Sequence, residues 1–300
     1  MSYYCGWDGG GSKTEVLCRD ASGKEIGRAV FGPLNINGAS RERVKQTIAD
    51  AVAYMASLAG GLAACERLVI GAAGVSNVQI YSFIEEHVRA EGYSGELLIV
   101  GDQEIALAGA VEGPGAVLIA GTGAICCGYD GKEKRTRVGG CGHLIDDGGS
   151  GYAIGRDILS AVARAEDGRA EPTCLRSMVF ERLGISEVRG IVSWLYNGST
   201  GKKEIAALAP LLLEALEMGD AAAQRIALCA AQELAALAIA AWKNLGLEAG
   251  ELAMTGSVLT HYEAIRTQVV SILAEAFPLM RVISPRGGAA EGAVRLAMQK

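Results

Sequence analysis

The sequence predicts an α/β protein, and the recurrence of short apolar runs is the first observation behind that prediction. Each run ends in Gly, Asp or Thr, as buried strands do when they open into loops, and helical patterns lie between the runs. The runs are LVIGAAG (68–74), LLIVGD (97–102), AVLIAGTG (116–123), LAMTGS (252–257) and MRVISP (280–285). A length of 300 residues suits two domains of about 100 to 200 residues each.

A weak internal duplication is the second observation. Near the start, GGGS precedes a strand and DASGKE (20–25); later, GTGA precedes a strand and YDGKE (129–133). Both stretches predict a β-hairpin with glycines at its tip, followed by a second turn that carries Asp and Gly. We expect two α/β halves that face each other across a cleft, each offering one glycine hairpin.

Helical segments complete the predicted architecture. Residues 40–58, with Ser40 as N-cap, and residues 80–91 have the apolar spacing of amphipathic helices. From about 154 to 247 the strand signal nearly vanishes, and long Ala- and Leu-rich helices end at Gly219 and Gly246. This region predicts a helical insertion in the second half.

Composition excludes several classes of function. The net charge of −6 and a pI near 5.3 argue against a nucleic-acid surface, because phosphate binding needs basic patches. The eight cysteines lack CxxC pairs or His partners at zinc spacing, and no signal peptide precedes the first strand, so we expect reduced thiols in the cytoplasm. The apolar stretch 234–242 is too short to span a bilayer, so no membrane partner is expected.

The stretch WDGGGSKTEV (7–16) is a candidate phosphate site. It nearly matches GxxxxGK[ST] through Gly6 and Gly11, but Ser12 stands where the lysine belongs, so the Walker pattern fails. The alternatives are an ordinary tight hairpin or one whose backbone N–H groups ring nucleotide phosphates, with Asp8 near a bound Mg²⁺ through water. In the second case the donors are Gly9, Gly10, Gly11, Ser12, Lys13 and Thr14.

The second hairpin and Asp102 extend this hypothesis. AGTGA (120–124) offers Gly121, Thr122 and Gly123 to phosphate, and two such hairpins make phosphate binding a stronger prediction than either alone. Asp102 ends an apparent strand and begins a helix. There it serves either as a general base for a hydroxyl that attacks phosphorus or as a helix cap.

Three further stretches are candidates for small-molecule contacts. The first, VGGCGHLIDDGGSGYAIGR (138–156), holds seven glycines with two acids, a His and a Ser, which is hard to explain as a linker. Asn35 and Asn37 suit a hydroxyl-rich ligand or an Asn turn, and Ser76 follows a strand as turn or ligand wall. At the end of another predicted strand, Gly256 would let an adenine ring lie on the backbone, and Ser257 would cap the next helix.

Taken in order, DGGGSKTE, GDQEIALAGA, LIAGTGAI, GGCGHLIDDGGSGYAIG and MTGSV resemble the sugar kinase, heat-shock ATPase and actin superfamily. Within it they look most like the N-acetylglucosamine kinase and BadF-type ATPase family. The resemblance implies two ribonuclease-H-like domains that flank a nucleotide cleft. Their expected extents are 1–112 with a C-terminal helix 288–300, and 113–287.

The resemblance also implies ATP and Mg²⁺ as cofactors, an amino sugar phosphorylated at its 6-hydroxyl, and a homodimer. Asp102 matches the catalytic base, and Asp8 joins it near the metal. Asp8–Thr14 match the first phosphate loop, Gly121–Gly123 the second, and Thr255–Ser257 the adenosine motif. The positions that match sugar contacts are Asn35 or Asn37, Ser76, Asp102, Gly140, Cys141 and Asp147.

Two departures from the family pattern bear on the substrate. The family shows GGWG and DEGS where this chain has GGCG and DGGS, so Cys141 replaces Trp and Gly148 replaces Glu. Both replacements predict smaller side chains in the walls of the sugar pocket, which opens the possibility of N-acetylmuramic acid or glucosamine. One alternative is an activator ATPase of a dehydratase or reductase with an iron–sulfur cluster. It is disfavoured because those activators carry cysteine in a CAAGTG-like context at the second hairpin, whereas here Ala120 directly precedes GTG. The other alternative is a nucleotide-binding module that catalyses no reaction.

Overall fold

The computed structural model describes residues 2–36 and 38–299, and the chain divides into two compact units. The first unit comprises Met1–Glu112 and Pro285–Lys300, and the second comprises Gly113–Ser284. The return to the first unit begins at Pro285 rather than at the expected residue 288. Each unit holds a five-stranded mixed sheet with helices packed on it, so the predicted α/β class is confirmed.

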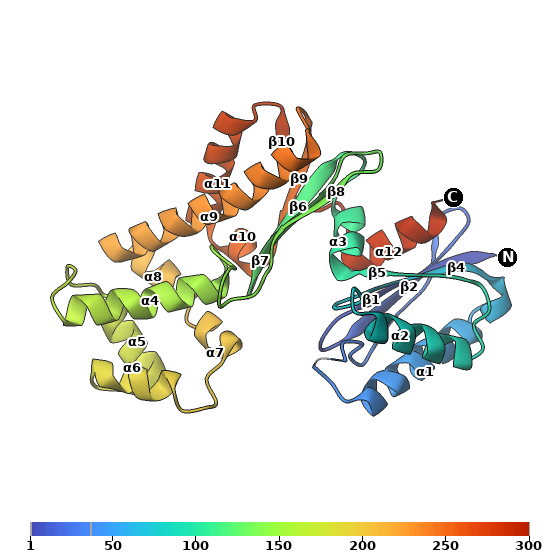
Figure 1. Cartoon of the computed structure of the whole chain (residues 1–300), viewed down its shortest axis with the longest axis horizontal. Helices are drawn as coiled ribbons and strands as arrows, with labels where there is room; N and C mark the ends of the chain where they lie inside the picture. Colours follow the sequence, from blue (N-terminus) through green and yellow to red (C-terminus); the bar gives the residue numbers. More distant parts are fainter. Residues whose placement is uncertain (1, 37, 300) are drawn as a thin grey trace. The chain divides into compact units, whose positions relative to one another are not determined.

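The first unit contains one sheet in the order β3-β2-β1-β4-β5. Strand β2 is antiparallel to its neighbours β1 and β3, whereas β1, β4 and β5 are parallel to one another. Its strands are β1 (Tyr3–Gly9), β2 (Thr14–Asp20), β3 (Glu25–Phe31), β4 (Cys65–Ala72) and β5 (Glu96–Gly101). Its helices are α1 (Arg41–Ser57), the 3₁₀ turn η1 (Leu62–Ala64), α2 (Val78–Ala90), α3 (Asp102–Ala110) and α12 (Ala289–Met298). Figure 1 shows α1 and α2 on one face of this sheet and α3 and α12 on the other.

Alternation along β1 explains why helices cover both faces. Cys5 and Trp7 are fully buried in the core that includes Ile48 of α1 and Ile84 of α2. Gly6 faces the opposite side of the sheet, and a Cβ added there would lie 2.4 Å from the backbone nitrogen of Val294 on α12. The predicted helix at 40–58 is confirmed as α1, and the Ser40 side chain caps it by accepting from the Arg43 N–H.

Helix α12 packs against α3 through glycines. A Cβ at Gly292 would lie 1.9 Å from the carbonyl oxygen of Ile105, and one at Gly109 would lie 2.1 Å from that of Gly288. The Arg295 guanidinium also donates to the carbonyl of Ala108 at 2.8 Å. The last helix of the chain therefore fixes α3, the helix that begins at Asp102.

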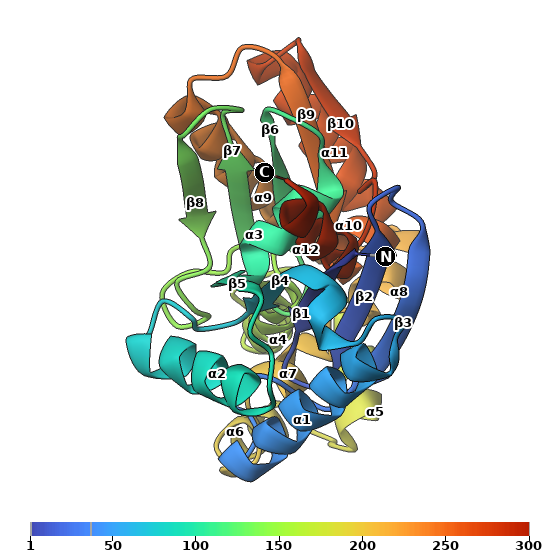
Figure 2. The same ribbon diagram turned by 90° about the vertical axis from the view of Figure 1, so that its right-hand side faces the viewer.

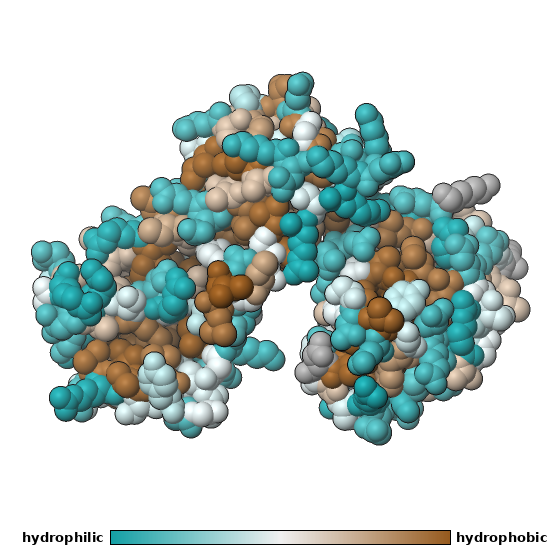
Figure 3. Space-filling view, in the orientation of Figure 1, coloured by the Kyte–Doolittle hydropathy of each residue, from teal (hydrophilic) through white to brown (hydrophobic). Residues whose placement is uncertain are grey.

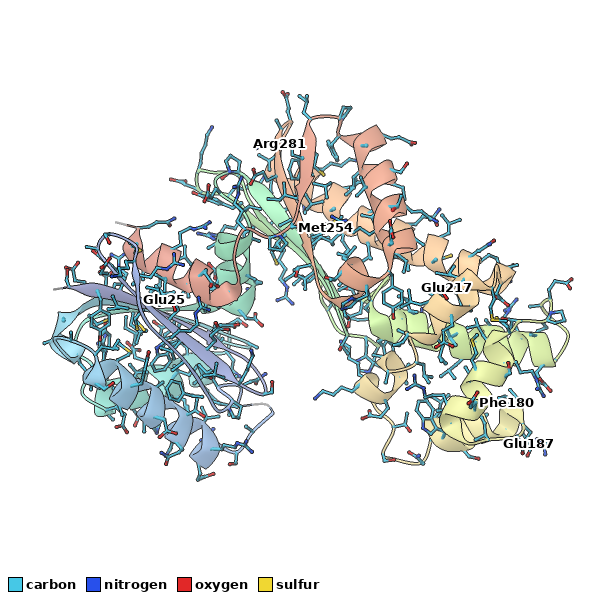
Figure 4. The ribbon with its side chains drawn as sticks, turned by 180° about the vertical axis from the view of Figure 1, so that it is seen from behind. Glu25, Phe180, Glu187, Glu217, Met254 and Arg281 are labelled. Carbon is cyan, nitrogen blue, oxygen red and sulfur yellow. The ribbon has the colours of Figure 1, made fainter. Side chains whose placement is uncertain are left out.

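The second unit contains a sheet in the order β10-β9-β6-β7-β8 (Figure 2). Its strands are β6 (Gly115–Ala120), β7 (Ala124–Tyr129), β8 (Arg135–Gly139), β9 (Gly250–Thr255) and β10 (Met280–Ile283). Its helices are α4 (Gly151–Glu166), α5 (Leu175–Leu183), α6 (Val188–Leu195), α7 (Lys202–Ala206), α8 (Leu211–Glu217), α9 (Ala221–Leu245), α10 (Ser257–His261) and α11 (Glu263–Ala276). Helices α4 to α9 follow β8 without an intervening strand and correspond to the predicted helical insertion. Figure 4 labels Arg281 on β10, whose guanidinium pairs with the buried Glu251 of β9 at 2.9 Å.

Helix α9 contains the apolar stretch 234–242. Within the described residues it is the one helix long and apolar enough to cross a membrane by length and composition, and the predicted apolar stretch is only a part of it. Half of its most apolar window is buried inside the protein. Ala231, Leu234 and Trp242 contact the core of the second unit, and burial in that core explains the composition.

The internal duplication extends to matching turns. After the first hairpin, the Asp20 carboxylate accepts the backbone N–H groups of Ser22 and Lys24 at 2.9 and 3.1 Å. After the second, the Asp130 carboxylate accepts those of Lys132 and Lys134 at 2.8 and 3.0 Å. The two predicted hairpins, with their second Asp turns, are confirmed as β1–β2 and β6–β7.

Candidate active site

In the first unit, candidate residues gather at the carboxyl edge of the sheet. Gly9, Ala72 and Gly101 are register partners across the parallel strands β1, β4 and β5. Asp8 therefore lies one residue before this level and Asp102 one residue after it. Ser76 lies exposed in the turn that follows β4. The carboxyl ends of parallel strands are the usual place for a ligand in α/β proteins.

The first glycine hairpin is a short exposed turn at this edge. The Gly10 N–H donates to the Lys13 carbonyl at 2.9 Å, and Gly11, Ser12 and Lys13 are exposed. The Leu34 N–H donates to the Gly10 carbonyl at 3.1 Å, so the loop that contains Asn35 is attached to the hairpin. Asn37, the other candidate sugar contact of this loop, lies outside the described residues.

Thr14 differs from its predicted role. Its side chain is fully buried, and its hydroxyl donates to the Gly32 carbonyl at 2.8 Å. A hydroxyl has one proton to donate, so Thr14 joins the hairpin to the loop that follows β3 instead of offering that proton to a phosphate. Ser12 and Lys13 remain the side-chain donors of this turn.

Asp102 is the first residue of α3 and is exposed. The N-cap position belongs to Gly101, and the Asp102 carboxylate accepts the N–H of its neighbour Gln103 at 2.9 Å. The alternative role as the helix cap is therefore wrong, although the carboxylate does satisfy one free N–H of the first turn. One carboxylate oxygen remains for a ligand.

The carboxylates of Glu15 and Asp102 act on that of Asp8 at this edge. Burial raises the pKa of Asp8 above its ordinary value, and the carboxylates of Glu15 and Asp102 raise it further, while Lys13 opposes the shift. Glu15 is the register partner of Asp8 on β2. A bound cation would relieve this repulsion, so Asp8 and Asp102 suit Mg²⁺. Among residues 2–36 and 38–299, no group of three His, Cys, Asp or Glu side chains is placed to hold a metal ion.

The Asp8→Asn variant is expected to melt at a higher temperature than the wild type at pH 7. A raised native pKa means that the folded state binds a proton more tightly than the unfolded chain does, so the stability contributed by Asp8 falls as pH rises through the shifted pKa. The amide removes that cost. Melting curves over roughly pH 4 to 8, a range that begins near the ordinary carboxyl pKa, measure the difference. Asp50→Asn on exposed α1 is the control, and a lower melting temperature for Asp8→Asn at pH 7 would contradict the assignment.

In the second unit, the second glycine hairpin is tied to α4. The Gly121 N–H donates to the Gly123 carbonyl at 2.9 Å, and the Gly121 carbonyl accepts the Gly151 N–H at 2.7 Å. Thr122 at the tip is exposed. This hairpin is therefore held at its base while its tip remains open to a ligand.

Asp147 differs from the predicted sugar contact. Only 3% of it is exposed; one carboxylate oxygen accepts the Ala124 N–H at 3.1 Å, and the other accepts from the Lys202 ammonium at 2.7 Å. Both oxygens are thus engaged within the second unit, and Asp147 supports the second hairpin. Sequence reasoning missed Lys202 because it lies 55 positions away along the chain.

The glycine-rich loop after β8 lines a cavity of about 380 Å³ together with residues of α4 and α9. Gly140, a candidate sugar contact, adopts φ +71°, and its carbonyl accepts from the Arg137 guanidinium. Cys141 is exposed, and its N–H donates to the Asp146 carboxylate at 3.0 Å. Side chains that line the cavity include His143, Ile145, Asp146, Arg156 and Glu233.

Gly148 does not simply leave space in this cavity. A Cβ at Gly148 would lie 2.6 Å from a carboxylate oxygen of Glu233 and 3.1 Å from its Cβ. The acid of α9 therefore occupies the place into which a side chain at position 148 would extend. This contact corrects the expectation that the replacement only shrinks the wall, and no local sequence pattern pointed to Glu233.

The predicted adenosine motif adjoins the second hairpin. Thr255 ends β9 in register with Ile119, and Gly256 adopts φ +95°. A Cβ at Gly256 would lie 2.3 Å from the Ala120 carbonyl oxygen, so glycine is required for this close approach. Ser257 is the first residue of α10 and not its cap, because Gly256 holds the N-cap position.

Known protein families and sequences resemble this chain over nearly its whole length. The model of the BadF/BadG/BcrA/BcrD ATPase family matches residues 5–297. The chain is 33% identical over 301 residues to an N-acetylmuramic acid/N-acetylglucosamine kinase of Clostridium acetobutylicum, covering 99% of this chain and 98% of that protein. It is 28% identical over 310 residues to an N-acetyl-D-glucosamine kinase of Dictyostelium discoideum, with 98% and 97% covered.

A solved structure extends the likeness to three dimensions. The crystal structure of a candidate N-acetylglucosamine kinase from Chromobacterium violaceum aligns with a TM-score of 0.75 at 26% identity, covering 100% of this chain and 99% of that one. The family model and the similarity to the clostridial kinase both extend over nearly the whole chain. The protein therefore belongs to the BadF/BadG/BcrA/BcrD ATPase family.

Proposed function

We propose that the protein is an ATP-dependent amino-sugar kinase that phosphorylates N-acetylglucosamine or N-acetylmuramic acid at the 6-hydroxyl. The observation that carries the proposal is the exposed Asp102, which lies at the carboxyl edge of the first sheet with Asp8 and the glycine hairpin. The names of the two similar kinases support the choice of substrate class.

In this proposal Asp102 is the general base. Its carboxylate accepts the proton of the sugar hydroxyl while the hydroxyl oxygen forms a bond to the γ-phosphorus of ATP, and the bond to ADP breaks. A hydroxyl of ordinary acidity attacks slowly without such a base. The exposed position of Asp102 leaves one carboxylate oxygen for this contact.

Phosphate donors are proposed in each unit separately. In the first unit they are the backbone N–H groups of Gly9–Gly11 with Ser12 and Lys13, and in the second unit they are Gly121–Gly123 with Thr122. Thr255–Ser257 bind the adenosine. Mg²⁺, held through water by Asp8 and Asp102, would offset the negative charge of the phosphates.

Sugar contacts are proposed for Asn35 or Asn37, Ser76, Gly140 and Cys141. Asp147 acts on the second hairpin instead, because both of its oxygens are engaged there. The choice between N-acetylglucosamine and N-acetylmuramic acid depends on whether the site accepts a lactyl group, and the clostridial relative is named for both sugars.

Coupled ADP release with Mg-ATP tests the proposal. The panel contains N-acetylglucosamine, N-acetylmuramic acid, glucosamine, N-acetylmannosamine, glucose and a control without sugar. We expect release only with one or two N-acetylated sugars, and mass spectrometry of the product identifies a sugar 6-phosphate. Equal release with and without every sugar would contradict a kinase and favour the activator ATPase, for which iron in the purified protein is the next measurement.

Cellular context belongs to the proposal as well. We propose a cytoplasmic location, because the cysteines of the described residues form no disulfide bond, as is usual in a reducing compartment. We also propose a homodimer, and sedimentation measures its mass.

A further inference from the structure

We propose that Lys202 of α7 binds the nucleotide phosphates at the second glycine hairpin, and that Asp147 positions it there. This inference rests on the proposed function, because it assigns a further residue to the nucleotide site of the kinase. Asp147 and Lys202 do not form a local sequence motif, since the two residues come together only in the folded second unit.

The position of the Lys202 ammonium is the first observation. It lies 2.7 Å from the Asp147 carboxylate, and a Cβ added to Gly123 would lie 3.0 Å from the ammonium nitrogen and 3.0 Å from the carboxylate. The charged end of Lys202 is therefore directly beside the last glycine of the hairpin. Any side chain at position 123 would crowd it.

Burial is the second observation. The Asp147 side chain is 3% exposed and the Lys202 side chain is 31% exposed. A buried carboxylate is costly unless it is paired and hydrogen-bonded, and Asp147 has both the ammonium and the Ala124 N–H. An ammonium has three N–H donors, and Lys202 directs one of them to Asp147, so it can also donate to an incoming phosphate.

Backbone geometry is the third observation. Asp147 adopts φ +65° and is the one non-glycine residue with positive φ among the described residues. That conformation is unfavourable for an L-amino acid and is found where the surrounding structure enforces it. The hydrogen bonds of the carboxylate with the Ala124 N–H and Lys202 hold Asp147 in this conformation.

Lys202 differs from its neighbour in ways that provide a matched control. Lys203 belongs to the same helix but is exposed, with no ion pair to Asp147. Both residues carry the same charge, so Lys203→Ala reproduces the change in net charge of Lys202→Ala without touching the hairpin.

Calorimetric titration of the full-length protein with Mg-ATP, Mg-ADP and adenosine tests the inference. Loss of a charge-assisted hydrogen bond should weaken Mg-ATP binding by about tenfold or more in Lys202→Ala. Adenosine binding should stay unchanged, Lys202→Arg should retain most of the affinity, and Lys203→Ala should match the wild type.

A double variant separates phosphate binding from structural support. Asp147→Asn/Lys202→Gln removes both charges together and leaves polar side chains to replace the ion pair, so it avoids an unpaired buried carboxylate. If this variant folds and binds Mg-ATP as the wild type does, Lys202 is only structural and the inference is overturned. Weaker Mg-ATP binding with unchanged adenosine binding supports it.

The outcome is distinguishable from failure of the proposed function. If the wild type does not bind Mg-ATP, both the inference and the kinase proposal are wrong. If every variant binds Mg-ATP equally and the wild type phosphorylates a sugar, the kinase stands and only the role of Lys202 is wrong.

Discussion

Replacing Asp102 by Asn is expected to lower kcat by about 10²–10⁴-fold, the usual loss on removal of a general base. The amide keeps the size of the side chain but cannot accept the proton of the sugar hydroxyl. Binding of ATP should persist, because the hairpin Gly9–Lys13 does not depend on that proton transfer. Coupled ADP release gives kcat, and calorimetry gives the affinity for Mg-ATP.

The control for this experiment is Asp50→Asn. Asp50 is an exposed carboxylate of α1, hydrogen-bonded to Gln46, so its replacement makes the same chemical change in the same unit. Its kcat should equal that of the wild type. An Asp102→Asn enzyme with undiminished turnover would show that another group accepts the proton.

Replacing Gly292 by Ala is expected to destabilise the first unit by about 3 kcal/mol, at the upper end of the cost of overpacking. The new methyl group would lie 1.9 Å from the Ile105 carbonyl oxygen and 2.4 Å from the Gly109 nitrogen, and backbone atoms cannot rotate away as a flexible side chain can. Helices α3 and α12 must therefore separate. For a unit of this size the melting temperature should fall on the order of 10 °C.

The same replacement should reduce activity, because α3 carries Asp102 at its first position. Hydrogen exchange should speed up in the amides of α3 and α12 and stay unchanged in α1. Gly11→Ala is the control for stability, since no atom lies within 4 Å of a Cβ placed there. A Gly292→Ala protein as stable as the wild type would mean that the two helices can move apart at little cost.

The surface of the second unit also carries apolar side chains that the site does not use. Figure 3 shows hydrophobic residues over α6, where Val188, Ile191 and Val192 line a groove with Leu159 of α4. Val192 is 55% exposed. Arg156 lines both this groove and the cavity at the glycine-rich loop.

The strands, the two glycine hairpins and the helical insertion could be predicted from sequence because each is encoded locally. A buried strand needs a short apolar run, and a tight turn needs glycine or Asp at fixed offsets, so LLIVGD and DASGKE suffice to indicate them. The Ser40 cap and the glycine at position 246, with φ +69°, are local in the same sense. These features do not depend on what packs beside them.

The roles of Thr14 and Asp147 could not be read in this way. Each has a residue type that suits a ligand, but a buried side chain binds whichever partner the fold brings near it. For Thr14 that partner is the Gly32 carbonyl on the neighbouring loop, and for Asp147 it is Lys202 on α7. A pattern of residue types records what a side chain can bind, and not what occupies the space around it.

By itself, the sequence determined the α/β class, the family resemblance and the positions of Asp8, Asp102 and the hairpins. Only the tertiary structure decided that burial, with Glu15 beside it, raises the pKa of Asp8, that Glu233 fills the space beside Gly148, and that Lys202 lies at the second hairpin. The physical reason is range: turn and strand preferences act between adjacent residues, whereas burial and charge pairing act between atoms that are near in space and distant along the chain.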